Sequence, residues 1–353
     1  MRGFWHKLKK PIIGLAPMDG VSDAAFRYIA AKYGKPDVII TEFTSVEGIC
    51  AGAIKTLEAF IYNEIERPIA AQIFGHTPEA FYKSAFVIGE LGFDGIDINM
   101  GCPAKNIASR GSGAALIKTP ALAKEIIKKT KEGAGDWSNG KKIEAVGLPE
   151  AIITYIQLYK EKHSITAQRK LLPVSIKTRI GFDTVVIEEW IKHLLETEPA
   201  NISIHGRTLK QMYGGAADWE MIAKAAKIAN KTNTTVLGNG DIKDLNDANA
   251  KIKQYGVDGV LIGRTAFGNP WVFKNKIPTL REKFDILLEH AKYYEKIFQE
   301  KQFSPMKKHL SWYCRGFENA SQMRQKLMQA ENAAEVEDII TEAKIDGRIL
   351  KIV

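Results

Sequence analysis

Cysteine is scarce in this chain of 353 residues, and long apolar runs are absent. The three cysteines, Cys50, Cys102 and Cys314, form no CxxC pair, and no histidine cluster lies near them at metal-ligand spacing. This spacing argues against a disulfide framework and a structural zinc site, so we expect no bound metal and a reducing, cytoplasmic location. No run reaches the roughly 18 apolar residues of a membrane span, and no signal-peptide pattern follows the basic N-terminus, so we expect a soluble protein.

The overall composition is that of a globular protein, with 45% hydrophobic and 26% charged residues. Lysine and arginine number 50 against 41 aspartate and glutamate residues, which gives a formal net charge of +9. A positive balance of this size favours a polyanionic partner, and nucleic acid is one hypothesis.

Short apolar runs recur along the chain with helical patterns between them. They span residues 12–18, 38–44, 69–75, 95–101, 173–180, 201–208, 234–241 and 259–264. Continuous apolar runs are typical of strands buried on both faces of a parallel sheet. Eight such units predict an α/β fold, a (β/α)₈ TIM barrel, with a doubly wound sheet as the alternative. Polar residues close nearly every run, and this favours the barrel because catalytic groups of barrels lie at strand ends.

The pattern changes after residue 272, where the sequence becomes rich in helix-forming residues and poor in glycine. We therefore expect a barrel domain over 1–272 and a helical domain over 279–353. Within 301–330, six residues are Lys or Arg and only Glu318 is acidic. Such a run is typical of a solvated helix face or of a nucleic-acid contact, and charge alone leaves both open.

One connection is much longer than the usual αβ loop of roughly 2–6 residues. It separates a helix that we expect to end near Lys131 from the strand at 173–180. The stretch GAGDWSNGKK (133–142) suggests flexible turns, and an amphipathic pattern predicts a helix from about Pro149. We interpret residues 132–170 as an inserted helical hairpin or flap, which either faces RNA or caps the barrel.

Two glycine-containing segments, GNGD (238–241) and IGR (262–264), end the last two runs. Glycine N–H groups and Arg264 at this place are typical of a phosphate site, because barrels commonly bind phosphate there. Tight βα turns are the alternative explanation.

Gln72, Lys177 and His205 close three other runs and are expected to project into the same barrel mouth. This mixture of cationic and amide groups suits a planar heterocycle that carries carbonyls and ring nitrogens. Cys102 lies in the loop NMGCPAKN at the same mouth. A thiol of ordinary pKa, about 8.5, stays protonated near neutral pH and is able to act as a general acid. A buried structural cysteine is the alternative.

The chain resembles the tRNA-dihydrouridine synthases along nearly its whole length, most nearly their B-type bacterial branch. The resemblance rests on several motifs in the same order: LAPMDGVSDAAFR (15–27), AAQIFG (70–75), GIDINMGCPAK (95–105), GSGAAL (111–116), SIKTRIGFD (175–183), HGRT (205–208), GNGDI (238–242), DGVLIGRTAFGNPWVF (258–273) and KKHLSWYCRGF (307–317).

The resemblance implies an FMN-binding barrel followed by a helical tRNA-binding domain. The residues that it places around FMN are Pro17, Met18, Gln72, Lys177, His205, Asn239, Gly240, Asp241, Gly263 and Arg264. It implies reduction of the C5–C6 double bond of a tRNA uridine in the D loop, with NADPH as the reductant and Cys102 as the acid. It also makes Asn99 and Arg179 candidates to bind the uracil edge.

The residues expected to contact the tRNA backbone are Lys307, Lys308, Arg315 and Arg324. We expect a monomer. Two further hypotheses stay open at this point. One is an FMN-dependent oxidoreductase of small molecules, of the dihydroorotate-dehydrogenase type, and the other is a tRNA-binding barrel without catalysis.

Overall fold

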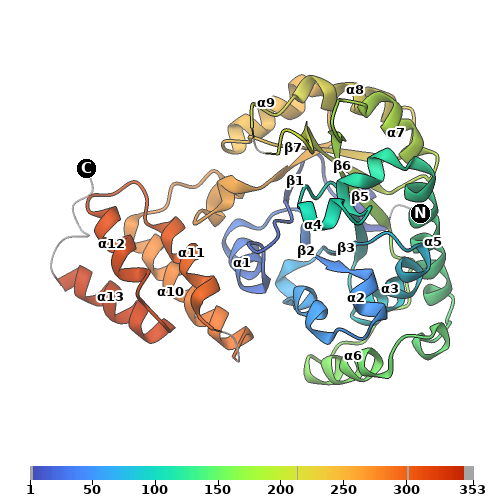
Figure 1. Ribbon diagram of the computed structural model, residues 1–353. Helices are drawn as coiled ribbons and strands as arrows, with labels where there is room; N and C mark the ends of the chain where they lie inside the picture. Colours follow the sequence, from blue (N-terminus) through green and yellow to red (C-terminus); the bar gives the residue numbers. More distant parts are fainter. Residues whose placement is uncertain (1–2, 213, 300–301, 346–353) are drawn as a thin grey trace.

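The computed structural model describes residues 3–212, 214–299 and 302–345 (Figure 1). Eight parallel strands form one closed barrel in chain order, and β1 completes it by pairing with β8. The strands are β1 (Ile12–Leu15), β2 (Ile39–Ser45), β3 (Ile69–Phe74), β4 (Gly95–Met100), β5 (Val174–Gly181), β6 (Asn201–Thr208), β7 (Thr235–Asn239) and β8 (Gly259–Ile262). The predicted (β/α)₈ barrel is confirmed, and the doubly wound alternative is wrong because an open sheet has no such closing pair.

Helices surround the barrel, and one short helix lies at the carboxyl ends of the strands (Figure 1). They are α1 (Ala24–Ile29), α2 (Val46–Cys50), α3 (Pro78–Glu90), α4 (Lys105–Ala108), α5 (Pro120–Ser138), α6 (Glu150–Lys162), α7 (Ile187–Leu195), α8 (Trp219–Ala229) and α9 (Leu245–Tyr255). Strand runs without polar alternation are explained by this arrangement, since both faces of each strand are buried.

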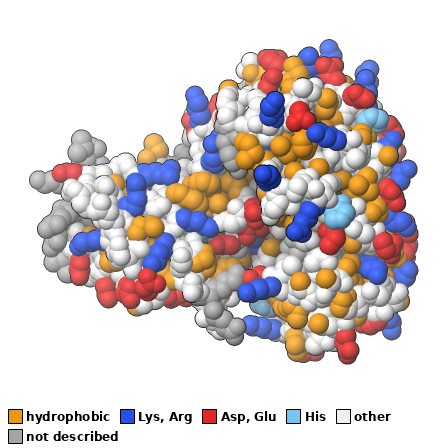
Figure 2. Space-filling view, in the orientation of Figure 1, with side chains coloured by type: hydrophobic (Ala, Val, Ile, Leu, Met, Phe, Trp, Pro, Cys, Tyr) orange, Lys and Arg blue, Asp and Glu red, His pale blue; other side chains and the backbone are white. Residues whose placement is uncertain are grey.

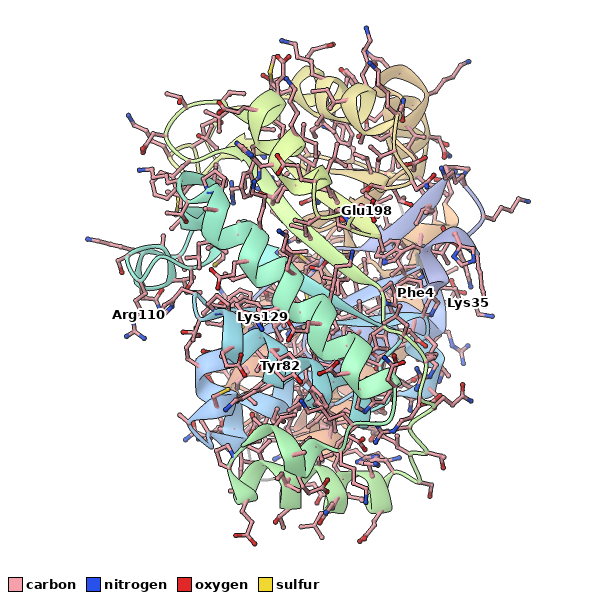
Figure 3. All side chains as sticks on the ribbon, turned by 90° about the vertical axis from the view of Figure 1, so that its right-hand side faces the viewer. Phe4, Lys35, Tyr82, Arg110, Lys129 and Glu198 are labelled. Atoms are coloured by element: carbon pink, nitrogen blue, oxygen red, sulfur yellow. The ribbon has the colours of Figure 1, made fainter. Side chains whose placement is uncertain are left out.

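A short N-terminal turn, η1 (Gly3–His6), closes one end of the barrel. Its Trp5 side chain is 1% exposed and packs in a small core with Leu237 and Leu261 from the strands. Figure 3 shows Phe4 of this turn and Arg110, which follows α4, on opposite sides of the barrel. The end at which Arg110 lies is the carboxyl end of the strands, and it is left for the functional site.

Four helices form the C-terminal part, as predicted: α10 (Leu280–Ile297), α11 (Ser304–Tyr313), α12 (Ala320–Leu327) and α13 (Ala333–Ile345). They share a second hydrophobic core that also includes Trp271 and three residues of α1, namely Ala24, Ala25 and Ile29. The helical part is therefore docked on α1 at one side of the barrel (Figure 1). Lys301 and residues 346–353 of the predicted helical domain lie outside the described residues. Within the described ranges, no helix has the length and apolar character that a membrane span requires.

The predicted end of a helix near Lys131 is wrong, because α5 continues to Ser138 through the glycine-containing stretch. Gly133 belongs to the helix for a packing reason. A Cβ at this position would lie 2.3 Å from the carbonyl oxygen of Tyr82, so glycine is what lets α5 approach α3 so closely. The turn-rich stretch predicted for 133–142 thus begins only after Ser138.

Trp137, at the end of α5, is 1% exposed and fills the space above Gly89 of α3. Its ring Nε1 donates a hydrogen bond of 3.0 Å to Glu90 Oε1. The helix predicted from about Pro149 is confirmed as α6, with Pro149 as its N-cap.

Several basic side chains of the predicted insertion are bound to the barrel wall. Arg169 donates to Glu90 Oε1 at 3.1 Å and to the carbonyl oxygen of Trp137 at 2.6 Å, and Lys160 also pairs with Glu90. Lys170 pairs with Asp94 at 3.1 Å. These contacts hold the segment before β5 against α3 and the following loop.

Candidate active site

The strands bring the predicted polar residues together at their carboxyl ends. In the barrel register, Asn99 of β4 lies beside Lys177 of β5, and His205 of β6 lies beside Asn239 of β7. Gln72 reaches the same region from β3. The predicted convergence of these side chains on one barrel mouth is therefore observed.

Hydrogen bonds link three of these strands inside the barrel. Gln72 Nε2 donates to Asp97 Oδ2 at 2.7 Å, and Gln72 Oε1 accepts a bond of 3.0 Å from Asn99 Nδ2. The other oxygen of Asp97 accepts from Ser175 Oγ at 2.7 Å. Gln72, Asp97 and Ser175 are fully buried. The buried Asp97 carboxylate thus holds the Gln72 amide in place.

The loop that carries Cys102 is fastened to Asn99. Asn99 Oδ1 accepts bonds from the backbone N–H groups of Gly101 at 3.0 Å and Cys102 at 2.8 Å. Gly113 packs beside this loop with φ of +60°, and a Cβ there would lie 3.2 Å from Cys102 Cβ. The thiol is half-buried, and burial raises its pKa above the usual range. This shift favours the protonated form of the Cys102 thiol at neutral pH.

Arg179 stabilises the loops of the mouth through their backbones. Its Nε donates to the Gly101 carbonyl oxygen at 2.7 Å, and its Nη1 donates to that of Thr208 at 3.1 Å. The side chain is only 5% exposed. Contact of Arg179 with a substrate stays a prediction, whereas its contact with the Cys102 loop is observed.

Lys177 and His205 differ in charge at neutral pH. Burial, together with nearby Arg179, lowers the pKa of Lys177 to about 8. Burial and the neighbouring cations lower the pKa of His205 to about 2, so the imidazole is neutral. The His205 Nδ1 atom is buried and has no hydrogen-bond partner among the described residues.

The loop after β7 is shaped by glycine and by a carboxylate. Gly240 has φ of +123°, and a Cβ there would lie 2.7 Å from Ala217 Cβ and 3.5 Å from His205 Nε2. Asp241 accepts from the Ala217 backbone N–H and from Arg264 Nη2, both at 2.8 Å. The predicted phosphate loop is therefore closely packed, and the more exposed Arg264 guanidinium is bound to it.

Two residues outside the predicted site also belong to this region, although Arg207 closes the same apolar run as His205 in the sequence. Arg207, which is 2% exposed, pairs with Asp241. Asp97 is the buried carboxylate described above. For Asp97 the available signal is alternation along a strand, because Asp97 and Asn99 are two residues apart on β4. For Arg207 alternation is not a guide, because the pairing of β5 with β6 is irregular after His205.

The loops after β1 and β8 meet at the remaining side of the mouth. The Met18 backbone N–H donates to Ser22 Oγ at 2.8 Å, which fixes the turn that follows Pro17. A Cβ at Gly263 would lie 3.4 Å from Met18 Sδ. Met18 and Gly263 thus lie together, and the contact of Pro17, Met18 and Gly263 with FMN stays a prediction.

A cavity of about 330 Å³ opens between this mouth and the helical part. Its walls come from the loop after β1, from β2, from the turn η3 (Ile54–Phe60) and from α10 and α11. Acidic Asp19, Asp23 and Glu42 line it, together with Lys55 and Lys308. Burial raises the pKa of Glu42 to about 7. No local pattern predicts this cavity, because the residues of its walls lie far apart along the chain.

The four predicted tRNA-contacting residues lie in or beside the helical part, and Figure 2 shows basic side chains over both this part and the barrel. Lys307 pairs with Glu331 at 2.5 Å, and Lys308 donates to the Gly20 carbonyl oxygen in the loop after β1. Arg324 donates to the Cys314 carbonyl oxygen at 2.9 Å. Arg315 and Arg324 are exposed, whereas the two lysines are partly buried.

The closed barrel, with polar side chains gathered at the carboxyl ends of its strands, has the layout of a barrel enzyme. The family model for dihydrouridine synthase (Dus) matches residues 14–136 and 156–348. The chain belongs to this family. The unmatched residues 137–155 lie inside the predicted insertion of 132–170.

Two curated relatives show how close the similarity is. The chain is 35% identical over 346 residues to the "probable tRNA-dihydrouridine synthase 2" of Bacillus subtilis (strain 168), covering 96% of this chain and 95% of that protein. It is 34% identical over 348 residues to the "probable tRNA-dihydrouridine synthase" of Staphylococcus aureus (strain MRSA252), with 96% and 95% covered.

Solved structures resemble the chain more distantly. Morphinone reductase matches with a TM-score of 0.46 and 13% identity, over 76% of this chain and 86% of that chain. DHODH from Eimeria tenella, in complex with ferulenol, matches with a TM-score of 0.46 and 14% identity, over 80% and 81%.

Proposed function

We propose that this protein reduces the C5–C6 double bond of a tRNA uridine to dihydrouridine, with FMN bound in the barrel mouth, NADPH as reductant and Cys102 as general acid. The carrying observation is that Asn99 fixes the Cys102 backbone in the same mouth as Gln72, Lys177 and His205, where burial raises the pKa of the thiol. Family membership favours this reaction over a small-molecule oxidoreductase or a barrel without catalysis.

The residues present fit FMN. The unpartnered, neutral His205 Nδ1 and the amide of Gln72 suit the polar edge of the ring. Lys177 adds a cation whose pKa burial lowers to about 8. Gly240 lets the loop after β7 pack against Ala217, since a Cβ there would lie 2.7 Å from Ala217 Cβ, and Gly263 lies beside Met18 in the loop after β8. In our assignment Asn239, Asp241 and Arg264 hold the phosphate side, and Pro17 and Met18 line the ring.

The chain supplies the acid and the orientation. Reduced FMN would supply the hydride that adds to C6 of the uracil ring. Cys102 donates its proton to C5, where the charge of the reduced ring is neutralised, and the thiolate regains a proton from solvent. Asn99 and Arg179 position the uracil edge in this proposal. The base must leave its stack to reach a thiol at this depth.

The tRNA backbone is proposed to contact the helical part. Arg315 and Arg324 are exposed there, and the ion pair of Lys307 with exposed Glu331 is of a kind that a phosphate is able to replace. Lys308 joins the helical part to the loop after β1, so a tRNA bound at Lys308 would lie beside the mouth.

The remaining assignments of this proposal are a barrel domain over 1–272, a tRNA-binding domain over 279–353, a D-loop uridine as the target and a monomeric protein. A cytoplasmic location, which the cysteine usage favours, also stays a prediction.

The test combines a spectrum with product mapping. The purified protein is expected to show a flavin absorption band, and incubation with unmodified tRNA and NADPH is expected to yield dihydrouridine at one position, located by mass spectrometry. Cys102→Ala should keep the flavin band and lose the product, whereas the control Cys50→Ala should keep both. Bound flavin without product from the wild-type protein would reject the proposed substrate.

A further inference from the structure

A buried carboxylate lies at the inner end of the hydrogen-bond chain that reaches Cys102. Asp97 is fully buried in β4 and accepts from Ser175 on one oxygen and from Gln72 on the other. Burial raises its pKa to about 6, so it is ionised at neutral pH and offers only acceptors. Burying a carboxylate costs free energy unless the group is hydrogen-bonded. Here an unbranched chain of hydrogen bonds runs from the Gln72 side of the carboxylate to the mouth.

The direction of these bonds is dictated by Asp97. Because the carboxylate accepts, Gln72 must present its Nε2 to Asp97 and its Oε1 to Asn99. Asn99 must then present its Nδ2 to Gln72 and its Oδ1 to the Cys102 loop. That oxygen is what the Gly101 and Cys102 N–H groups require.

Reversing either amide would place a donor against a donor. A flipped Asn99 would aim its NH₂ group at the two backbone N–H groups of the Cys102 loop and leave them unsatisfied. Leaving a partly buried donor without an acceptor costs more than a typical hydrogen bond contributes. The loop position therefore depends on an acceptor three side chains away.

We propose that Asp97 is a positioning residue: it fixes the amide orientation of Gln72, and through Gln72 that of Asn99, so that the Cys102 thiol is held at the mouth. Asp97 acts through these side chains and touches no reacting atom. The significance for catalysis rests on the proposed acid role of Cys102, whereas the structural coupling does not.

The first arm of the test compares two replacements of Asp97 by alkylation of Cys102 with iodoacetamide, followed by peptide mass spectrometry in a Cys50→Ser background. Asp97→Asn is expected to label within twofold of the parent. Its Oδ1 still accepts from Gln72, and Ser175 Oγ has the Ile96 carbonyl oxygen 3.1 Å away as another acceptor. Asp97→Leu removes the acceptor and is expected to label about fivefold faster, the equivalent of one hydrogen bond.

The second arm asks whether the direction of the chain can be reversed. Asn99→Asp places Gln72 between two carboxylates, and its NH₂ group is able to face only one of them. At pH 8 this variant is expected to hold the Cys102 loop less firmly, so that Cys102 is labelled faster. Adding Asp97→Asn allows Gln72 to flip, accepting from the amide at 97 and donating to the carboxylate at 99. The double variant is therefore expected to label about fivefold more slowly than Asn99→Asp alone.

Cys314 is buried and serves as the internal reporter, because its labelling marks an unfolded variant. Equal labelling rates for Asp97→Asn and Asp97→Leu would overturn the proposal. Such a result would mean either that only the negative charge of Asp97 matters or that Asp97 has no effect on the Cys102 loop. The proposal would also be overturned if Asp97→Asn changed the labelling rate of Cys102 by the same factor in the parent protein and in the Asn99→Asp variant. If Asp97→Leu does not fold, the second arm alone decides. Alkylation needs neither tRNA nor turnover, so failure of the proposed reaction is seen separately, in the product assay.

Discussion

The barrel mouth and the helical part hold their polar side chains in different ways. In the mouth, Gln72 and Asp97 are fully buried and bound to side chains of neighbouring strands. In the helical part, Lys307 meets a partner, Glu331, whose side chain is 68% exposed, and Arg315 lies in solvent. The two regions are therefore suited to different tasks. The buried, directional hydrogen bonds of the mouth suit the positioning of a thiol, whereas the accessible charges of the helical part suit contact with a phosphate backbone.

The largest loss of stability is expected from substitutions at the joint, by which we mean α1 and the residues of the helical part that pack on it. Arg27 of α1 and Glu66 form a salt bridge of 2.8 Å with both side chains at 0% exposure, and the helical part packs on the same helix. Arg27→Met should lower the free energy of unfolding by about 3–5 kcal/mol, because it leaves a buried carboxylate unpaired. Urea denaturation measures this loss.

The matched control is Lys32→Met, which removes an exposed pair with Glu289 at 2.7 Å near the same joint. Its expected cost is below about 1 kcal/mol. Equal losses for the two variants would contradict the distinction between buried and exposed charge.

The joint also contains a buried histidine that should make it acid-sensitive. Burial lowers the pKa of His309 to about 3, and Asp23 Oδ2, 3.7 Å from its Nε2, is too far for a hydrogen bond. The unfolded chain takes up a proton below about pH 6.5 and the folded chain does not, so stability falls with pH from 6.5 towards 3, by about 1.4 kcal/mol per pH unit.

Urea midpoints between pH 5 and 7 test this prediction. His309→Gln should remove that part of the slope. An unaltered slope in His309→Gln would mean that His309 takes up its proton in the folded state as well.

The smallest of these effects concerns the accessible charge of the helical part. Replacing both Arg315 and Arg324 by alanine should reduce the slope of log affinity for tRNA against log salt by about 1.4–1.8. Filter binding between low and moderate salt measures the slope, and the flavin band should not change.

The control replaces Lys142 and Lys162, two exposed lysines of the predicted insertion. We expect their slope to match that of the wild-type protein, because the insertion is bound to the barrel wall. A similar fall in both variants would make the insertion a second RNA surface.

The sequence allowed the strands and most of the mouth to be predicted, for a physical reason. Buried strands need unbroken apolar runs, so a polar residue such as Gln72 or Lys177 at the end of a run stands out. Asp97 was missed because it lies within a run rather than at its end. The predicted end of α5 is wrong because a glycine such as Gly133 suggests a turn in the sequence. In the structure Gly133 lies within the helix and allows close packing against Tyr82.

The pairing of the basic residues was beyond the reach of the sequence. Lys308 meets Gly20 across 288 positions of the chain, and no local pattern indicates such a contact. The charge count identified the basic region correctly but gave no information on which cations are already bound within the protein.

The most direct measurement separates the two halves of the proposed reaction by stopped-flow absorbance of the flavin band. For Cys102→Ala we predict reduction by NADPH at the wild-type rate and reoxidation by tRNA slowed by about 10²–10⁴-fold, the range for loss of a general acid. Reoxidation by tRNA at the wild-type rate would contradict the central claim that the thiol at the barrel mouth supplies the proton.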